Sequence, residues 1–356
     1  MKKSLIKVAS VAAVLTLGLT GCAANEGNGD SNLTGTLNGA GSSAMGSAQE
    51  AWIAEYQTAN GSVSINYDPT GSGAGREAFF SGAVNFAGSD SSLKDEELAL
   101  TSSNCAPDSK FFEVPVYVSP IAVIFNVDGV TDLNLSSDTL AKIFKGTIKK
   151  WNDAAIVAEN PGVALPAAAI TAVHRSDDSG TTKNFSDYLS KTASAIWDGE
   201  VSDVFPYKSG EGAKGTSGVV DAVKNGKNTI GYADASKAGD LGTAKLKVGE
   251  TWVAYSAEAA AKIVETSPRV EGRDANDMAV KIDRNSTDAS TYPLVLVSYA
   301  IGCTVYADAE IGKLVKSYIG YLVTEGAQAT AQTNAGSAPL SAAVREEAAA
   351  IIKNIK

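Results

Sequence analysis

Three short stretches of the chain combine glycine with hydroxyl side chains in a way that suits an anion. They are residues 39–44, 70–75 and 176–182, and each lies between an expected strand and an expected helix. A helix N-terminus offers unpaired backbone N–H groups and a partial positive charge. Glycine allows close approach of the backbone, and Ser and Thr add donors without net charge. One such turn is usually only a capped helix, but three together predict an anion site.

A charged residue accompanies the third turn. Arg175 immediately precedes it and provides a permanently charged planar fork that fits a tetrahedral oxyanion. The alternative is that Arg175 forms a solvated salt bridge.

The same region also permits an enzymatic interpretation. A nucleophilic Ser179 would need a base, and the single histidine of the chain is His174. We interpret His174 as an ordinary residue at the end of a strand. Two distant cysteines and one histidine do not make a metal-ligand cluster, so we expect no metal, no cofactor and no catalysis. A phosphatase or serine hydrolase remains the less favoured alternative.

The N-terminus has the pattern of an export signal. Three lysines, at positions 2, 3 and 7, precede an uncharged and mostly apolar stretch at 8–19 that is short for a membrane span. The following Leu-Thr-Gly-Cys at 19–22 resembles a bacterial lipobox, which predicts a signal peptide at 1–21 and lipid attachment at Cys22, with ordinary signal cleavage as the alternative. Residues 22–32 are small and polar and would form a tether. The protein is therefore expected to be extracytoplasmic and lipid-anchored to the cell membrane.

Composition narrows the class of protein further. The formal net charge of −10 disfavours nucleic-acid binding, which depends on Lys and Arg meeting phosphates. The length after residue 21 suggests two domains. With Cys22 assigned to lipid, Cys105 and Cys303 remain as an even pair in an oxidising compartment, which predicts a disulfide, with two buried thiols as the alternative.

Short apolar strands alternate with amphipathic helices, which predicts an α/β fold. Long apolar runs occur at 114–126, where Pro115 and Pro120 would break the run into pieces, and at 292–304. We expect the chain to pass between two domains at these runs. Residues 33–118 and 290–356 would then form one discontinuous domain, and residues 119–289 the other. The stretch 327–343 predicts only a loop or a weak helix.

Individual helices are also expected from local pattern. Apolar spacing predicts a helix at 44–60, with Trp52 and Tyr56 on its apolar face. A second helix is expected at 137–144, capped by Ser136 or Ser137, and a third at 218–225.

Several segments resemble a known family. The run from Arg175 to Thr182 is similar to the R-x-D-x-S-G-T signature of the phosphate-binding proteins of bacterial ABC importers, the PstS family. The segments 84–90, 39–43, 149–153 and 230–232 resemble other landmarks of that family, in the same order along the chain. The resemblance implies a two-domain fold of the type II periplasmic-binding-protein kind, with the ligand cleft between the domains.

The resemblance also implies a site and a role. The function would be capture of inorganic phosphate and its delivery to the permease subunits of an ABC importer, by a monomer; a receptor for sulfate or molybdate is the alternative. Ala44 stands where the family often has an aromatic residue, and Asp178 where it commonly has glycine. The implied phosphate ligands are Ser43, Ala44, Ser72, Asp90, Arg175, Ser179, Gly180 and Thr181, with Asp177 in support.

The resemblance gives the two aspartates different roles. Asp177 would hold the fork of Arg175 in place. Asp90, as the implied acidic ligand, can face an anion only if the anion carries a proton to donate, as phosphate does near neutral pH and sulfate does not. A site built around such a hydrogen bond can reject an analogue that lacks it by about 10⁴–10⁵. The alternative is that Asp90 caps the turn that follows it.

Overall fold

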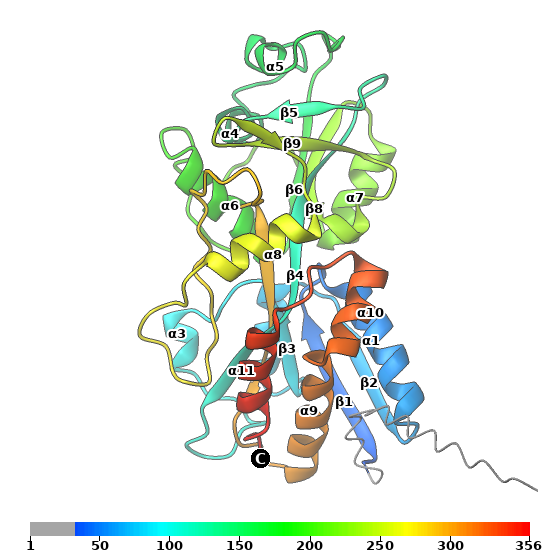
Figure 1. Ribbon diagram of the computed structural model, residues 1–356, viewed down its shortest axis with the longest axis vertical. Helices are drawn as coiled ribbons and strands as arrows, with labels where there is room; N and C mark the ends of the chain where they lie inside the picture. The colour runs from blue at the N-terminus through cyan, green and yellow to red at the C-terminus, as the bar shows by residue number, and fades with distance from the viewer. Residues whose placement is uncertain (1–32) are drawn as a thin grey trace, which may run out of the picture.

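The computed structural model describes residues 33–356, so the predicted signal peptide, Cys22 and the tether lie outside the described residues. The molecule is elongated, and one long strand, β4 (Phe111–Asn126), runs along its middle (Figure 1). We call the part around the lower half of β4 in that view lobe A and the part around its upper half lobe B. Helix α8 (Ala257–Thr266) lies across the middle of the molecule.

The elements divide between the lobes as follows. Lobe A contains β1 (Gly35–Gly41), α1 (Gly46–Ala59), β2 (Val63–Asp68), α2 (Ser72–Phe80), β3 (Phe86–Ser89), α3 (Asp95–Leu98), β11 (Val295–Cys303), α9 (Ala309–Leu322), α10 (Glu325–Ala335) and α11 (Ala342–Ile352). Lobe B contains β5 (Leu133–Leu135), α4 (Ser137–Phe144), α5 (Ala154–Glu159), β6 (Thr171–Arg175), α6 (Gly180–Thr192), β7 (Glu211–Ala213), α7 (Gly215–Asn225), β8 (Thr229–Asp234), the 3-10 helix η1 (Ala235–Lys237), β9 (Gly242–Val248) and β10 (Thr251–Val253). This is the α/β architecture that the alternating pattern predicts.

Strand β4 is shared by both lobes because it changes partner along its length. The strands pair in the order β2-β1-β3-β11-β4-β8-β6-β7, with β5, β9 and β10 beside this path. From Phe111 to Pro120 the strand pairs antiparallel with β11, and from Ile121 to Asn126 it pairs antiparallel with β8. The two lobes are therefore joined by continuous backbone at the point where one partner replaces the other.

The two prolines of β4 do not break it, contrary to the sequence expectation. Pro115 pairs with Tyr299 at a shift of register, and Pro120 pairs with Val295 at the very start of β11. At both places the ladder is irregular or changes partner, so the missing N–H is tolerated. The prediction for 114–126 was wrong in this respect, because proline position relative to the partner strand cannot be read from the chain itself.

Most other elements follow from local pattern. Helix α1 buries Trp52 and Tyr56 on one face, as its apolar spacing predicts. Helix α4 has the predicted bounds, and the Ser136 hydroxyl caps it by accepting from the Thr139 N–H. The weakly patterned stretch 327–343 holds the end of α10, which stops at Gly336 in a left-handed conformation, before α11 begins.

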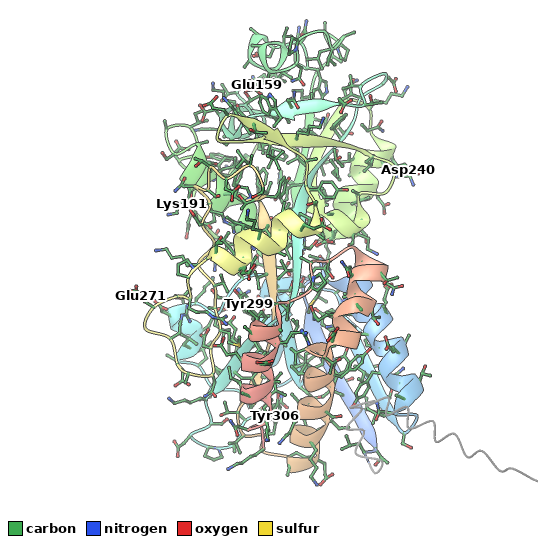
Figure 2. All side chains as sticks on the ribbon, viewed as in Figure 1. Glu159, Lys191, Asp240, Glu271, Tyr299 and Tyr306 are labelled. Carbon is green, nitrogen blue, oxygen red and sulfur yellow. A yellow bond between two sulfur atoms is a disulfide. The ribbon has the colours of Figure 1, made fainter. Side chains whose placement is uncertain are left out.

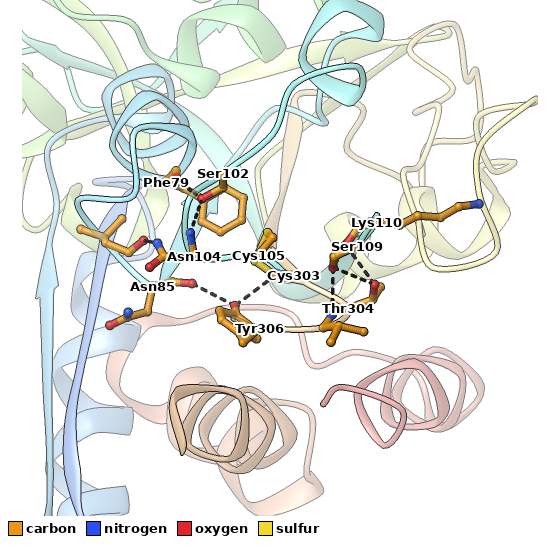
Figure 3. The surroundings of a disulfide bond; sticks show 12 residues. Phe79, Asn85, Ser102, Asn104, Cys105, Ser109, Lys110, Cys303, Thr304 and Tyr306 are labelled. Atoms are coloured by element: carbon orange, nitrogen blue, oxygen red, sulfur yellow. Dashed lines mark hydrogen bonds between the residues drawn. A yellow bond between two sulfur atoms is a disulfide. The ribbon is translucent and has the colours of Figure 1, made fainter. Parts of the chain in front are cut away.

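Strand β11 runs from the junction of the lobes toward the far end of lobe A. Tyr299 lies near the middle of the molecule and Tyr306, just after the strand, near its lower end (Figure 2). The disulfide expected from the sequence is present there, between Cys105 and Cys303 (Figure 3). Among residues 33–356, no helix combines the length and the apolar character that crossing a membrane requires.

Candidate functional site

Arg175 is the last residue of β6, and its backbone N–H donates to the hydroxyl of Tyr232 in the neighbouring β8 at 3.3 Å. The side chain is only 3% exposed. Its guanidinium donates to Asp177 twice, from Nε to Oδ1 at 2.7 Å and from Nη2 to Oδ2 at 2.5 Å. This is the bidentate geometry in which a carboxylate fixes the orientation of an arginine. The structure therefore places Asp177 beside Arg175 in the way the sequence predicts.

Asp177 is held as an anion by its neighbours. Burial alone would raise the pKa of the Asp177 carboxyl, but the hydrogen bonds and the charge of Arg175, together with the N–H of Gly215, lower that pKa overall. The Gly215 N–H donates to Asp177 Oδ1 at 3.0 Å. Asp177 thus links the arginine to the N-terminus of α7. The neighbouring Asp178, which stands where the family commonly has glycine, is exposed.

The third Gly/Ser/Thr turn leads into α6, and its residues from Ser179 to Thr182 are buried. The Ser179 hydroxyl caps the helix by accepting from the Thr182 N–H at 3.2 Å. Gly180 packs so closely against lobe A that an added Cβ would lie 2.7 Å from the Asp90 Cβ and 2.8 Å from the Ser72 Oγ. Only glycine fits there, so the N-terminus of α6 can approach the carboxylate from the other lobe.

Asp90 follows β3 and is 4% exposed. Its Oδ1 accepts from the Ser298 hydroxyl of β11 at 2.7 Å, and its Oδ2 accepts from the Thr181 hydroxyl of lobe B at 3.3 Å. Its backbone N–H donates to the Ser72 hydroxyl at 3.0 Å. Burial raises the pKa of Asp90, and hydrogen bonds from Ser42 and Ser298 and the charge of Arg175 counteract this only in part.

The structure therefore brings Asp90 and Arg175 together, although they lie in different lobes. The positive charge of Arg175 acts on Asp90, and Thr181 contacts Asp90 directly. Ser72, the first residue of α2, lies against both Gly180 and the backbone of Asp90. A permanently charged fork, a buried carboxylate and two helix N-termini converge here, which is an arrangement suited to a protonated oxyanion.

The first turn contacts the start of α7 in lobe B. The Ser43 hydroxyl lies 3.0 Å from the Thr216 hydroxyl of lobe B and accepts from the Thr216 N–H at 3.1 Å. The Ala44 N–H donates to the Ser42 hydroxyl at 3.1 Å. Ser43 therefore contacts the other lobe, and the roles of Ser43 and Ala44 as anion ligands stay predictions.

Sequence reasoning missed three contributors to this region. Ser42 was quoted in the first turn but given no role, and Ser298 interrupts the apolar run of β11 with a fully buried hydroxyl, which is a readable signal. The third is the start of α7, where Gly215 and Thr216 contact Asp177 and Ser43. The helix was expected only from residue 218, which hid a fourth strand–turn–helix segment of the same kind.

The side chains that suggested enzymatic chemistry are otherwise engaged. His174 stacks on Phe205 with ring centroids 3.9 Å apart, and its Nδ1 lies 2.9 Å from the Arg175 carbonyl oxygen. The Ser179 hydroxyl caps its own helix. Within the part of the chain that the structure describes, no three His, Cys, Asp or Glu side chains form a group that could hold a metal ion.

Comparison with known proteins agrees with this geometry. Residues 26–325 match the PBP superfamily domain. The chain is 37% identical to the phosphate-binding protein PstS 3 of Mycobacterium leprae, covering 80% of this chain and 78% of that protein. It is 32% identical to the phosphate-binding protein PstS 2 of Mycobacterium tuberculosis, covering 97% of each.

Solved structures show the same fold at low identity. A periplasmic phosphate-binding protein, PfluDING, solved with phosphate bound, has a TM-score of 0.73 at 22% identity, covering 89% of this chain and 93% of that one. A phosphate-binding protein from Stenotrophomonas maltophilia has a TM-score of 0.68 at 20% identity, covering 89% and 94%. The chain therefore has the two-domain periplasmic-binding fold that the sequence resemblance implies.

Proposed function

Because the chain belongs to the PstS family of phosphate-binding proteins, within the PBP superfamily, we propose that it captures inorganic phosphate between lobes A and B. The captured phosphate is then delivered to the membrane subunits of an ABC importer. The relatives carry the name phosphate-binding protein, and delivery to a permease is the role that the PstS name implies.

The observation that carries this proposal is the convergence of Arg175 and Asp90. The guanidinium neutralises the charge of the anion and fixes its orientation through paired N–H donors. The Asp90 carboxylate accepts a hydrogen bond from the protonated oxygen of phosphate. The N-terminus of α6 supplies further N–H donors at Gly180 and Thr181. Ser43, Ala44, Ser72 and Ser179 complete the proposed ligand set.

The proposed mechanism is closure of two domains on the anion. We divide the chain into residues 33–118 with 290–356 and residues 119–289, and the change of partner along β4 between Pro120 and Ile121 supports this division. In the conformation described, contacts such as Thr181 to Asp90 already join the two lobes. Phosphate would enter when these contacts part and would be enclosed when they form.

The proposal includes export and anchoring. We propose that residues 1–21 are a signal peptide, that Cys22 carries lipid and that residues 22–32 tether a monomeric receptor outside the membrane. Bacterial growth with a radiolabelled fatty acid should label the protein and not a Cys22→Ser variant. Unchanged labelling of that variant would place the lipid elsewhere.

A calorimetric titration tests the binding function. The purified protein should bind inorganic phosphate and should bind sulfate far more weakly, because sulfate at neutral pH has no proton for Asp90. Equal binding of both anions favours a general oxyanion receptor. A phosphate ester that is turned over by the protein and spared by a Ser179→Ala variant would favour an enzyme, which the family relationship does not suggest.

A further inference from the structure

Asp203 lies in the segment of lobe B between α6 and β7 and touches both sides of the proposed phosphate site. Its Oδ2 accepts from Arg76 Nη2 at 2.6 Å, and its Oδ1 accepts from the Ser91 hydroxyl at 2.6 Å. Arg76 lies on α2 and Ser91 directly follows Asp90, so both partners belong to lobe A. The side chains of Arg76 and Asp203 are only 2% and 5% exposed.

Arg76 is oriented by its own lobe before it reaches across. Its Nε donates to Glu97 at 2.9 Å, and its Nη1 donates to the Ser89 hydroxyl at 2.9 Å. Only Nη2 is directed to Asp203. The guanidinium is therefore a preformed donor on lobe A, and the bond to Asp203 requires no rearrangement of Arg76 when the lobes meet.

The backbone of Asp203 is tied to the phosphate turn itself. Its carbonyl accepts from the Ser179 N–H at 2.9 Å, and Ser179 is the residue that caps α6. One residue of lobe B thus holds the anion-facing helix N-terminus through its backbone and holds lobe A through its carboxylate. Movement of the lobes apart must break the carboxylate contacts.

We propose that Asp203, Arg76 and Ser91 form a latch between the lobes that sets how long phosphate is retained, although none of the three belongs to the proposed ligand set. This inference rests on the proposed function. In the closed protein the two charges are buried and compensate each other. When the lobes part, water reaches both, so the latch biases the equilibrium between open and closed forms rather than the stability of either lobe. Loss of the Asp203 charge leaves Arg76 with Glu97 as its charged partner and removes the ion pair between the lobes, which destabilises the closed form.

The test measures phosphate release by stopped flow. Asp203→Asn and Arg76→Met should each speed phosphate dissociation by about 30-fold or more, with the association rate changed little, because phosphate enters the open form. The dissociation rate of the double variant should rise by less than the product of the two single effects, since each single variant already removes the Arg76–Asp203 pair. Single effects that multiply in the double variant would overturn the coupling.

A matched control separates a latch from general damage. Asp198 is also an aspartate in an ion pair, with Lys145 at 2.7 Å, but both residues belong to lobe B. Asp198→Asn should leave phosphate dissociation unchanged. In phosphate-free buffer, Asp203→Asn should unfold thermally close to the wild type, while small-angle X-ray scattering with phosphate should show a larger radius of gyration than the wild type has.

Failure of the latch and failure of the proposed function give different results. A wild-type protein that does not bind phosphate rejects the function. A wild-type protein that binds phosphate, with dissociation unaffected by Asp203→Asn and Arg76→Met, rejects only the latch. If Asp203→Asn does not fold, Ser91→Ala removes just one hydrogen bond of the latch and should speed dissociation about threefold to tenfold; an unchanged rate overturns the proposal.

Discussion

Lobe B presents Arg175, Ser179 and Thr181 from one continuous segment, whereas lobe A assembles its contribution from residues on or next to β1, α2, β3 and β11. In lobe B the charged group is Arg175, which already donates two hydrogen bonds to Asp177. In lobe A the charged group is a carboxylate whose pKa is raised by burial and which depends on hydroxyls from distant elements. We therefore propose that lobe B provides the attraction for any oxyanion and that lobe A provides the discrimination between phosphate and sulfate.

The strongest test of this difference between the lobes is to remove the selectivity for phosphate over sulfate alone. Asp90→Asn should bring sulfate binding close to phosphate binding, with the selectivity ratio falling by up to about 10⁴, because an amide can donate to sulfate where a carboxylate repels it. Titration calorimetry with each anion measures the ratio. The exposed Asp132, paired with Lys245 in lobe B, offers the control Asp132→Asn. A ratio that survives in Asp90→Asn would place discrimination elsewhere.

Removing attraction should affect both anions alike. Arg175→Met should weaken phosphate binding by about 10²–10³-fold, because it deletes the cation and leaves Asp177 buried without its partner. The weaker sulfate binding should fall by a similar factor. Arg345→Met, at a partly exposed pair with Glu325 within lobe A, should leave both affinities unchanged. A loss confined to phosphate would contradict the division of work between the lobes.

At low pH the wild-type protein should be less selective for phosphate over sulfate. Because burial raises the pKa of Asp90, the carboxyl takes up its proton at a higher pH than an exposed aspartate, and a protonated Asp90 can donate to sulfate. Sulfate affinity should therefore rise as the pH falls toward the raised pKa of Asp90. Asp90→Asn has no proton to gain, so its sulfate affinity should stay flat. Equal pH dependence of the two proteins would assign the effect to another group.

The smallest expected effect concerns the support of the carboxylate. Ser298→Ala removes one hydrogen bond to Asp90 and should weaken phosphate binding about threefold to tenfold, with a further upward shift in the pKa of Asp90. Ser137→Ala, which removes a hydroxyl hydrogen bond within lobe B, should leave binding unchanged. An unaffected Ser298→Ala variant would show that lobe A does not need this hydroxyl.

The same contrast explains what the sequence could predict. The residues from Arg175 to Thr182 are neighbours in the chain, so their chemistry and their placement before a helix are visible together. Ser42 and Ser298 reach Asp90 only because β1 and β11 pair with β3 in the folded protein. For Ser298, the one sequence signal is a serine within an otherwise apolar strand.

The fold shows the same limit. Capped and periodic helices such as α4 were predicted to the residue, because the signal is local. The continuity of β4 through Pro115 and Pro120 was not, because it depends on where β11 begins and shifts register. The Arg76–Asp203 contact likewise joins residues far apart in the chain. No local pattern around either residue predicts that the two side chains pair.

The disulfide has a topological consequence. Cys105 and Cys303 both lie in lobe A and are separated by 198 positions, so the bridge closes a covalent ring that contains the whole of lobe B. A protease that cuts one exposed loop of lobe B would open the ring without releasing a fragment. Such a nicked molecule would migrate as a single species until a reductant is added, and only then would it separate into two pieces.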